Sequence, residues 1–152
     1  MKIFYEDQNL IAIDKPAGVL THPDFAKASL GKRAVKKNKP TVVDWLVKKY
    51  PETLKYQWPE PERPGIVHRL DENTSGILLL AKNPATLKKL QNQWKRGLVK
   101  KEYLALVVGK VKEPGEIIAF IGRQRRKQRQ IASFIAPKGR AKNIKTAQTR
   151  YD

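Results

Sequence analysis

The sequence contains no cysteine, only two histidines and few acidic residues. Without cysteine there is no disulfide framework and no thiolate metal site. The two histidines, His22 and His68, are too few and too far apart to indicate a metal site by themselves. No apolar run approaches the roughly 20 residues that span a bilayer, and the first residues lack the apolar core of a signal peptide. These absences predict a cytoplasmic protein that holds no metal and does not enter a membrane.

Acidic side chains are so outnumbered by basic ones that charge is the strongest global property of the chain. Lys and Arg total 32 against 14 Asp and Glu, which gives a formal net charge of +18. Such an excess favours a polyanionic partner, because each neutralised phosphate releases condensed counterions. The charges do not line one face of an amphipathic helix, which disfavours a membrane-surface helix. The expected partner is therefore a nucleic acid rather than a membrane.

Hydrophobic periodicity predicts a single α+β domain with a mixed, largely antiparallel sheet and flanking helices. One helix is expected from a Thr41 N-cap to Tyr50, and another from Asn83 to about Arg96 with Gly97 at its end. The basic segment 24–40 is expected to be a loop, and the proline-rich segment 57–65 a rigid connector. Strands are expected at residues 2–5, 10–13, 66–70, 77–81, 103–108, 116–121, 130–135 and 146–151.

A lone carboxylate, Asp71, follows the apolar run 66–70 and begins the polar stretch that leads to the next apolar run. If 66–70 is a strand, Arg69 and Asp71 share a face, because alternate residues of a strand point the same way. A guanidinium at that position favours the ionised carboxylate that nucleophilic catalysis needs. An aspartate that opens a turn and caps its amides is the more ordinary explanation, and spacing alone favours it.

The same stretch also matches part of a calcium-binding loop. Asp71, Asn73, Ser75 and Gly76 fit the first half of an EF-hand loop. The twelfth position of such a loop requires a bidentate glutamate, and this chain has Lys82 there. A lysine at that position, in a chain of this net charge, excludes calcium.

The stretch Gly65-Ile66-Val67-His68-Arg69-Leu70-Asp71, followed by Thr74-Ser75-Gly76, resembles the catalytic signature of the RluA family of RNA pseudouridine synthases. The resemblance continues in family order through Lys15-Pro16-Ala17-Gly18, the segment 101–107 and residues 145–151. It implies a pseudouridine synthase-like fold with Asp71 as the nucleophile. Arg69 would fill the gap left by the flipped uridine, and Tyr103 would pack on the uracil. Without the resemblance, Tyr103 fits an ordinary core position nearly as well.

The implied reaction breaks the C1′–N1 bond of uridine, turns the base and rejoins it through C5. No redox or metal step is required, so no cofactor is expected. The expected substrate is ribosomal or transfer RNA, and the domain, if complete, is expected to be a monomer. The cluster 123–129 has five cations in seven residues, which favours a phosphate-contacting hairpin tip over a solvated turn. The residues expected to contact RNA are Arg69, Lys101, Arg123, Arg125, Arg126 and Arg129.

The family's C-terminal motif has no counterpart in this sequence. That motif supplies an arginine that pairs with the catalytic aspartate, next to a His-Gln-Ile-Arg stretch. Residues 1–152 are therefore expected to form a catalytic domain that is incomplete at its C-terminus. Two alternatives to an active enzyme stay open: an RNA-binding remnant without a complete site, and a ribosome-associated basic protein.

Overall fold

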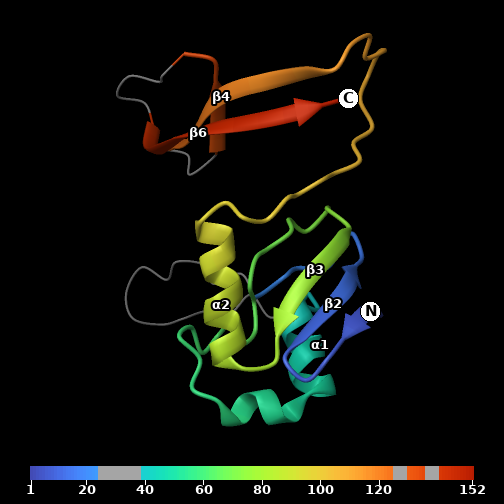
Figure 1. Ribbon diagram of the computed structural model, residues 1–152, viewed down its shortest axis with the longest axis vertical. Coiled ribbons are helices and arrows are strands. Elements are labelled where there is room, and N and C mark those ends of the chain that lie inside the picture. Colours follow the sequence, from blue (N-terminus) through green and yellow to red (C-terminus); the bar gives the residue numbers. More distant parts are fainter. Residues whose placement is uncertain (24–38, 125–129, 136–140) are drawn as a thin grey trace. The chain divides into compact units, whose positions relative to one another are not determined.

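The computed structural model describes residues 1–23, 39–124, 130–135 and 141–152. It divides into two compact units, Met1–Lys101 and Glu102–Asp152 (Figure 1). Each unit contains a three-stranded sheet whose paired strands are antiparallel. The predicted α+β class is confirmed, although these strands form two separate sheets rather than one. Most of the predicted loop over 24–40 lies outside the described residues.

The sheet of the first unit has the order β1-β2-β3, with β1 at Lys2–Glu6, β2 at Leu10–Lys15 and β3 at Gly76–Ala81. The predicted strands 2–5, 10–13 and 77–81 are therefore confirmed. Asp7 fixes the turn between β1 and β2, because its Oδ1 accepts hydrogen bonds from the Asn9 and Leu10 amides at 2.6 and 2.8 Å. These bonds hold the pKa of Asp7 below its ordinary value.

Both predicted helices of this unit form where their capping residues lie. Helix α1 (Val42–Lys49) begins with a capping box in which Thr41 and Asp44 bond each other's backbone amides. It continues into the 3-10 turn η1 (Pro51–Lys55). Helix α2 (Pro84–Lys95) has Asn83 as N-cap, with the Asn83 side chain accepting the Thr86 amide at 2.9 Å. Gly97 follows α2 with a φ of 69°, as expected for a glycine that ends a helix.

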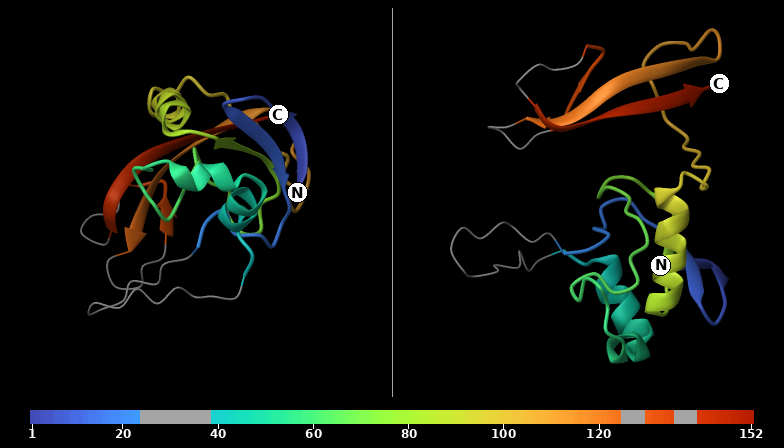
Figure 2. Two further views of the ribbon diagram at one scale, coloured as in Figure 1. Left: turned by 90° about the horizontal axis from the view of Figure 1, so that it is seen from below. Right: turned by 60° about the vertical axis from the view of Figure 1, so that its left-hand side comes forward.

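Strand β3 separates two apolar clusters. Leu78 and Leu80 pack on β2 and α1 in the larger cluster, whose members include Ile11, Ile13 and Leu46. Ala81 faces the smaller cluster, formed with Trp58, Val67 and Leu87 of α2. The left panel of Figure 2 shows β3 between α1 and α2, in agreement with these two sets of contacts. Full burial of each large aliphatic side chain stabilises the fold by about 1.5–3 kcal/mol.

The predicted strand 66–70 is wrong beyond its first residue. Gly65 and Ile66 do follow β3: the Ala81 amide donates to the Gly65 carbonyl at 2.8 Å, and Ile66 forms a bridge with Leu80. Gly65 has a φ of 71°, and a Cβ there would lie 2.5 Å from the Ala81 carbonyl oxygen, so the approach requires glycine. After Ile66 the ladder stops, because the Leu79 amide donates to the ring of His68 instead of to a backbone carbonyl.

The second unit has the strand order β5-β4-β6, with β4 at Gly115–Gln124, β5 at Gln130–Ser133 and β6 at Ala141–Tyr151. The strands predicted at 116–121 and 146–151 are thereby confirmed, and the one predicted at 130–135 is confirmed over 130–133. The strand predicted at 103–108 is wrong, because that segment is irregular and three of its apolar side chains are fully exposed: Leu104, Leu106 and Val108. An apolar run forms a strand only where a partner completes the ladder, and no described strand pairs with this segment. Of the helices in the described segments, none is both long and apolar enough to cross a bilayer.

Candidate active site

Asp71 lies on the loop that leads from the Ile66 bridge back into β3, and its side chain is 81% exposed. The expected pairing with Arg69 is present, with Arg69 Nη2 at 3.4 Å from Asp71 Oδ1. Both side chains are exposed, so this ion pair contributes at most about 1 kcal/mol to stability. Its significance is chemical: it places one guanidinium beside one accessible carboxylate.

The backbone around Asp71 is held much more firmly than its side chain. Leu70 is buried in the larger apolar cluster, and its carbonyl accepts a hydrogen bond from Thr21 Oγ1 at 2.8 Å. The Glu72 carbonyl accepts the Gly18 amide at 2.8 Å, and the Asp71 carbonyl accepts the Thr74 amide at 3.1 Å. The carboxylate is therefore presented to solvent from a loop whose path is fixed on both sides.

A buried lysine beneath this loop is the residue that sequence reasoning missed. Lys15 is 0% exposed, and its Nζ donates to the carbonyls of Pro16, Val19 and Glu72 at 3.0, 2.8 and 3.2 Å. These three bonds use all three hydrogens of the ammonium group. Burial lowers the pKa of Lys15, while the nearby charges of Glu72 and Asp71 oppose that shift.

The sequence does carry a signal for Lys15. Ile11, Ile13 and Lys15 alternate along β2, so the lysine points to the face that carries the apolar core. A cation at such a position must find polar partners inside the protein. In this chain those partners connect the Lys15-Pro16-Ala17-Gly18 turn to the residue that follows Asp71.

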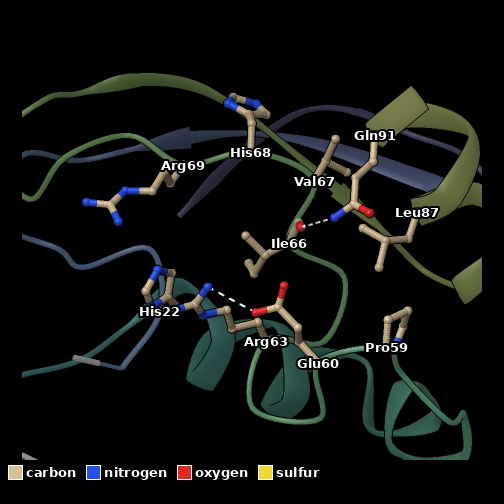
Figure 3. Close-up of a pocket in the computed structure, with 10 residues that line it drawn as sticks. All are labelled: His22, Pro59, Glu60, Arg63, Ile66, Val67, His68, Arg69, Leu87 and Gln91. Atoms are coloured by element: carbon tan, nitrogen blue, oxygen red, sulfur yellow. Dashed lines mark hydrogen bonds and ion pairs between the residues drawn. The ribbon is translucent and has the colours of Figure 1, made fainter. Parts of the chain in front are cut away.

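A pocket of about 250 Å³ adjoins the loop on the side of α2 (Figure 3). Inside it, Arg63 Nη1 donates to Glu60 Oε2 at 3.0 Å, and Gln91 Nε2 makes a long contact of 3.5 Å with the Ile66 carbonyl. Asp71 is not among the lining residues, so the pocket meets the Arg69–Asp71 pair only through Arg69. The pocket is lined by His22, Pro59, Glu60, Arg63, Ile66, Val67, His68, Arg69, Leu87 and Gln91.

The other predicted site residues fall outside this loop. Lys101 is exposed at the end of the first unit, and Tyr103 belongs to the second unit with its side chain 66% exposed. Arg123 lies in β4, where its backbone pairs with Gln130 of β5. Arg125, Arg126 and Arg129 lie outside the described residues. Within the part of the chain that the structure describes, no three His, Cys, Asp or Glu side chains gather as a metal site would require.

Comparison with known proteins assigns the chain to a family. The model of the RNA pseudouridylate synthase family matches residues 9–150. The chain belongs to this family. Its relatives include the ribosomal large subunit pseudouridine synthase D of Borreliella burgdorferi, which is 38% identical over 146 residues. The synthase C of Rickettsia prowazekii is 36% identical over 139 residues. These names and the family match confirm the predicted resemblance to RluA-type pseudouridine synthases.

Coverage differs between this chain and its pseudouridine synthase relatives. The two alignments include 95% and 91% of this chain but only 40% of each relative. A solved structure, human RNA Pseudouridylate Synthase Domain Containing 4, matches with a TM-score of 0.50 over 98% of this chain and 52% of that chain. Sequence identity to it is 16%, so this match supports the fold alone.

Proposed function

We propose that the protein isomerises uridine to pseudouridine in ribosomal or transfer RNA, with Asp71 as the nucleophile and without a cofactor. One observation supports the proposal most strongly. In a chain of this family, the carboxylate of Asp71 is exposed on a loop that hydrogen bonds hold on both sides. Names of relatives that refer to the large ribosomal subunit favour ribosomal RNA. We further propose that the protein acts in the cytoplasm as a monomer.

The chemistry requires the target base to leave its stack, which costs a few kcal/mol. In the proposed reaction the Asp71 carboxylate attacks the sugar or the pyrimidine ring, and the C1′–N1 bond breaks. The base turns, a C1′–C5 bond forms and the bond to the Asp71 carboxylate breaks, which regenerates the free carboxylate. N1 takes up a proton and the original C5 proton is lost to solvent. Arg69, two residues before the nucleophile, is proposed to occupy the space that the base leaves in the RNA.

The same proposal assigns roles to residues outside the loop. Tyr103 packs on the uracil in the proposed complex, and Lys101 contacts the RNA backbone beside it. The cluster 123–129 binds phosphate through its arginines. The net charge of +18 supports this assignment, because a positively charged surface attracts the RNA phosphates and releases their counterions on binding.

Residues 1–152 are proposed to form part of a synthase catalytic domain. The alignments support this, because the chain matches about two fifths of each relative's length. The alternative is an RNA-binding remnant, in which the basic surface is retained without a complete site.

Tritium release from RNA labelled at uridine C5 tests the proposed activity. The 152-residue chain is expected to release little tritium, whereas an extended chain, carrying the remaining C-terminal part of the Borreliella burgdorferi relative, is expected to turn over. Robust release by the 152-residue chain would contradict the proposed incompleteness. Release by neither form would contradict the enzyme and favour the RNA-binding remnant.

RNA affinity is expected to fall steeply as salt is raised from about 50 to 200 mM, because phosphate neutralisation releases counterions. Neutralising Arg125, Arg126 and Arg129 together to glutamine is expected to lower the slope of log affinity against log salt by about 3. A matched control neutralises three exposed helical lysines, Lys48, Lys55 and Lys89. Equal slopes for both triple variants would show that the cluster makes no special contact with RNA. Fluorescence anisotropy with labelled RNA measures the slope.

A further inference from the structure

His68 occupies the point where the loop that carries Asp71 leaves β3. The Leu79 amide, on the edge of β3 away from β2, donates to His68 Nε2 at 3.1 Å. Two residues along the strand, the Ala81 amide donates to the Gly65 carbonyl in ordinary backbone fashion. The imidazole therefore takes the place of a main-chain acceptor in the ladder. Figure 3 shows His68 on this segment between Val67 and Arg69.

The contacts of the ring define its protonation state. A backbone amide can only donate, so Nε2 must offer a lone pair, and the proton of a neutral ring then resides on Nδ1. The ring also stacks on Trp94 of α2, with centroids 4.6 Å apart and planes inclined by 17°. A second proton on the ring would bind to Nε2 and turn it into a donor. Two donors would then face each other, and the hydrogen bond with the Leu79 amide would be lost.

The surroundings keep the ring neutral near pH 7. Burial lowers the pKa of His68 below its ordinary value, and the positive charge of Lys101 lowers it further. The neighbours on β3 and α2, the Leu79 amide and the Trp94 ring, carry no charge. The charged or titratable groups that share the pocket with His68 are His22, Glu60, Arg63 and Arg69.

The residue that this bond constrains most directly is Arg69. On one side of it, His68 is bonded to β3 and stacked on α2. On the other side, Leu70 is buried and its carbonyl is bonded by Thr21. Breaking the His68 bond removes the contact with β3 on the first side, leaving only the stacking on Trp94 there, and it leaves the second side unchanged. The contact that depends on both is the one of 3.4 Å between Arg69 and Asp71.

We propose that His68 is a positioning residue, which in its neutral form bonds the Leu79 amide and holds Arg69 in register with Asp71. Protonation of His68 in mild acid releases Arg69 and lowers turnover without abolishing the fold. This role rests on the proposed pseudouridine synthase activity. It differs from catalysis itself, because His68 acts through Arg69 rather than on the RNA.

Two substitutions separate the hydrogen bond from the bulk of the ring. His68→Gln keeps an acceptor within reach of the Leu79 amide and cannot titrate, whereas His68→Leu keeps apolar bulk and has no acceptor. In the 152-residue chain, the Leu79 amide is expected to exchange at least about tenfold faster in His68→Leu than in the wild type or His68→Gln. The Leu79 amide chemical shift is expected to titrate below pH 6.5 in the wild type alone, because the pKa of His68 lies below that ordinary value.

The lowered pKa of His68 also predicts how stability changes with pH. The folded state has the lowered pKa, so the unfolded chain takes up the His68 proton first as pH falls below about 6.5. The denaturation midpoint is therefore expected to hold steady above that pH and to decline below it. This His68-dependent part of the decline is absent from His68→Gln.

Turnover is measured in the 152-residue chain or the extended chain, whichever is active before His68 is replaced. His68→Leu is expected to lower the single-turnover rate constant by about ten- to a hundredfold, with RNA affinity unchanged within about twofold. His68→Gln is expected to stay within about threefold of wild type at pH 7.5 and to lose less of its rate at pH 5.5. If the wild type is active, but His68→Leu changes neither the exchange of the Leu79 amide nor the single-turnover rate constant, the positioning role is overturned and the proposed function is not. A wild type inactive at every pH would overturn the proposed function, and this role with it.

Discussion

Replacing Asp71 with asparagine is expected to abolish pseudouridine formation, by at least about 10⁴-fold, because an amide cannot serve as the nucleophile. RNA affinity is expected to stay the same, since one carboxylate adds nothing attractive to a polyanion. Stability is also expected to change by less than about 1 kcal/mol, because Asp71 is 81% exposed and its ion pair with Arg69 spans 3.4 Å. Single-turnover kinetics and anisotropy titrations on the same RNA measure the two effects.

The matched control for this substitution is Glu72→Gln. Glu72 is the next carboxylate along the loop, and its side chain pairs with Lys39 on the surface. Glu72→Gln removes one negative charge from the loop, as Asp71→Asn does, but leaves the proposed nucleophile in place. Turnover of Glu72→Gln close to wild type, beside an inactive Asp71→Asn, assigns the loss to Asp71. Near-wild-type turnover by Asp71→Asn would remove it from the mechanism.

Replacing Lys15 with methionine is expected to lower the free energy of unfolding by about 2–4 kcal/mol. Methionine matches the length of the lysine stem but leaves the carbonyls of Pro16, Val19 and Glu72 without the donor that they share. Burial already opposes the charge of Lys15, so the loss comes from the orphaned acceptors rather than from the ion itself. Urea denaturation followed by circular dichroism measures the change.

Lys39→Met provides the comparison for Lys15→Met. Lys39 also contacts Glu72, but it does so through the exposed carboxylate rather than the backbone carbonyl, with its own side chain 60% exposed. Its replacement is expected to change the free energy of unfolding by less than about 1 kcal/mol. Lys15→Met is also expected to slow turnover, because the Glu72 carbonyl anchors the loop directly after Asp71. Equal, small effects of both substitutions would show that Lys15 does not hold the loop.

The helices were predictable because their determinants are local. Thr41 and Asp44 lie within one turn of each other, and Asn83 is followed directly by the proline that begins α2. The two wrong strands have strand-like composition, but pairing depends on distant residues. At 66–70 the Leu79 amide bonds an imidazole rather than a carbonyl, and at 103–108 no described strand supplies a ladder. Neither of these pairing features can be predicted from composition alone.

The active-site loop was predictable only in part, for a similar reason. The pairing of Arg69 with Asp71 follows from a separation of two residues in extended chain, and the structure contains it although the segment is not a strand. The sequence predicts no partner for Lys15, because Glu72 is 57 residues away and the contact depends on the folded chain. His68 belongs to the motif that the sequence shows, but its bond to Leu79 depends on the position of β3.

The central claim is that Asp71, held on this loop, converts uridine to pseudouridine. It is tested most directly by nucleoside analysis of ribosomal RNA after incubation with the extended chain and with its Asp71→Asn variant. The expected result is a loss of uridine equal to the gain of pseudouridine with the wild-type residues, and no gain with the variant. Equal pseudouridine from both proteins, or none from the wild type, would contradict the claim.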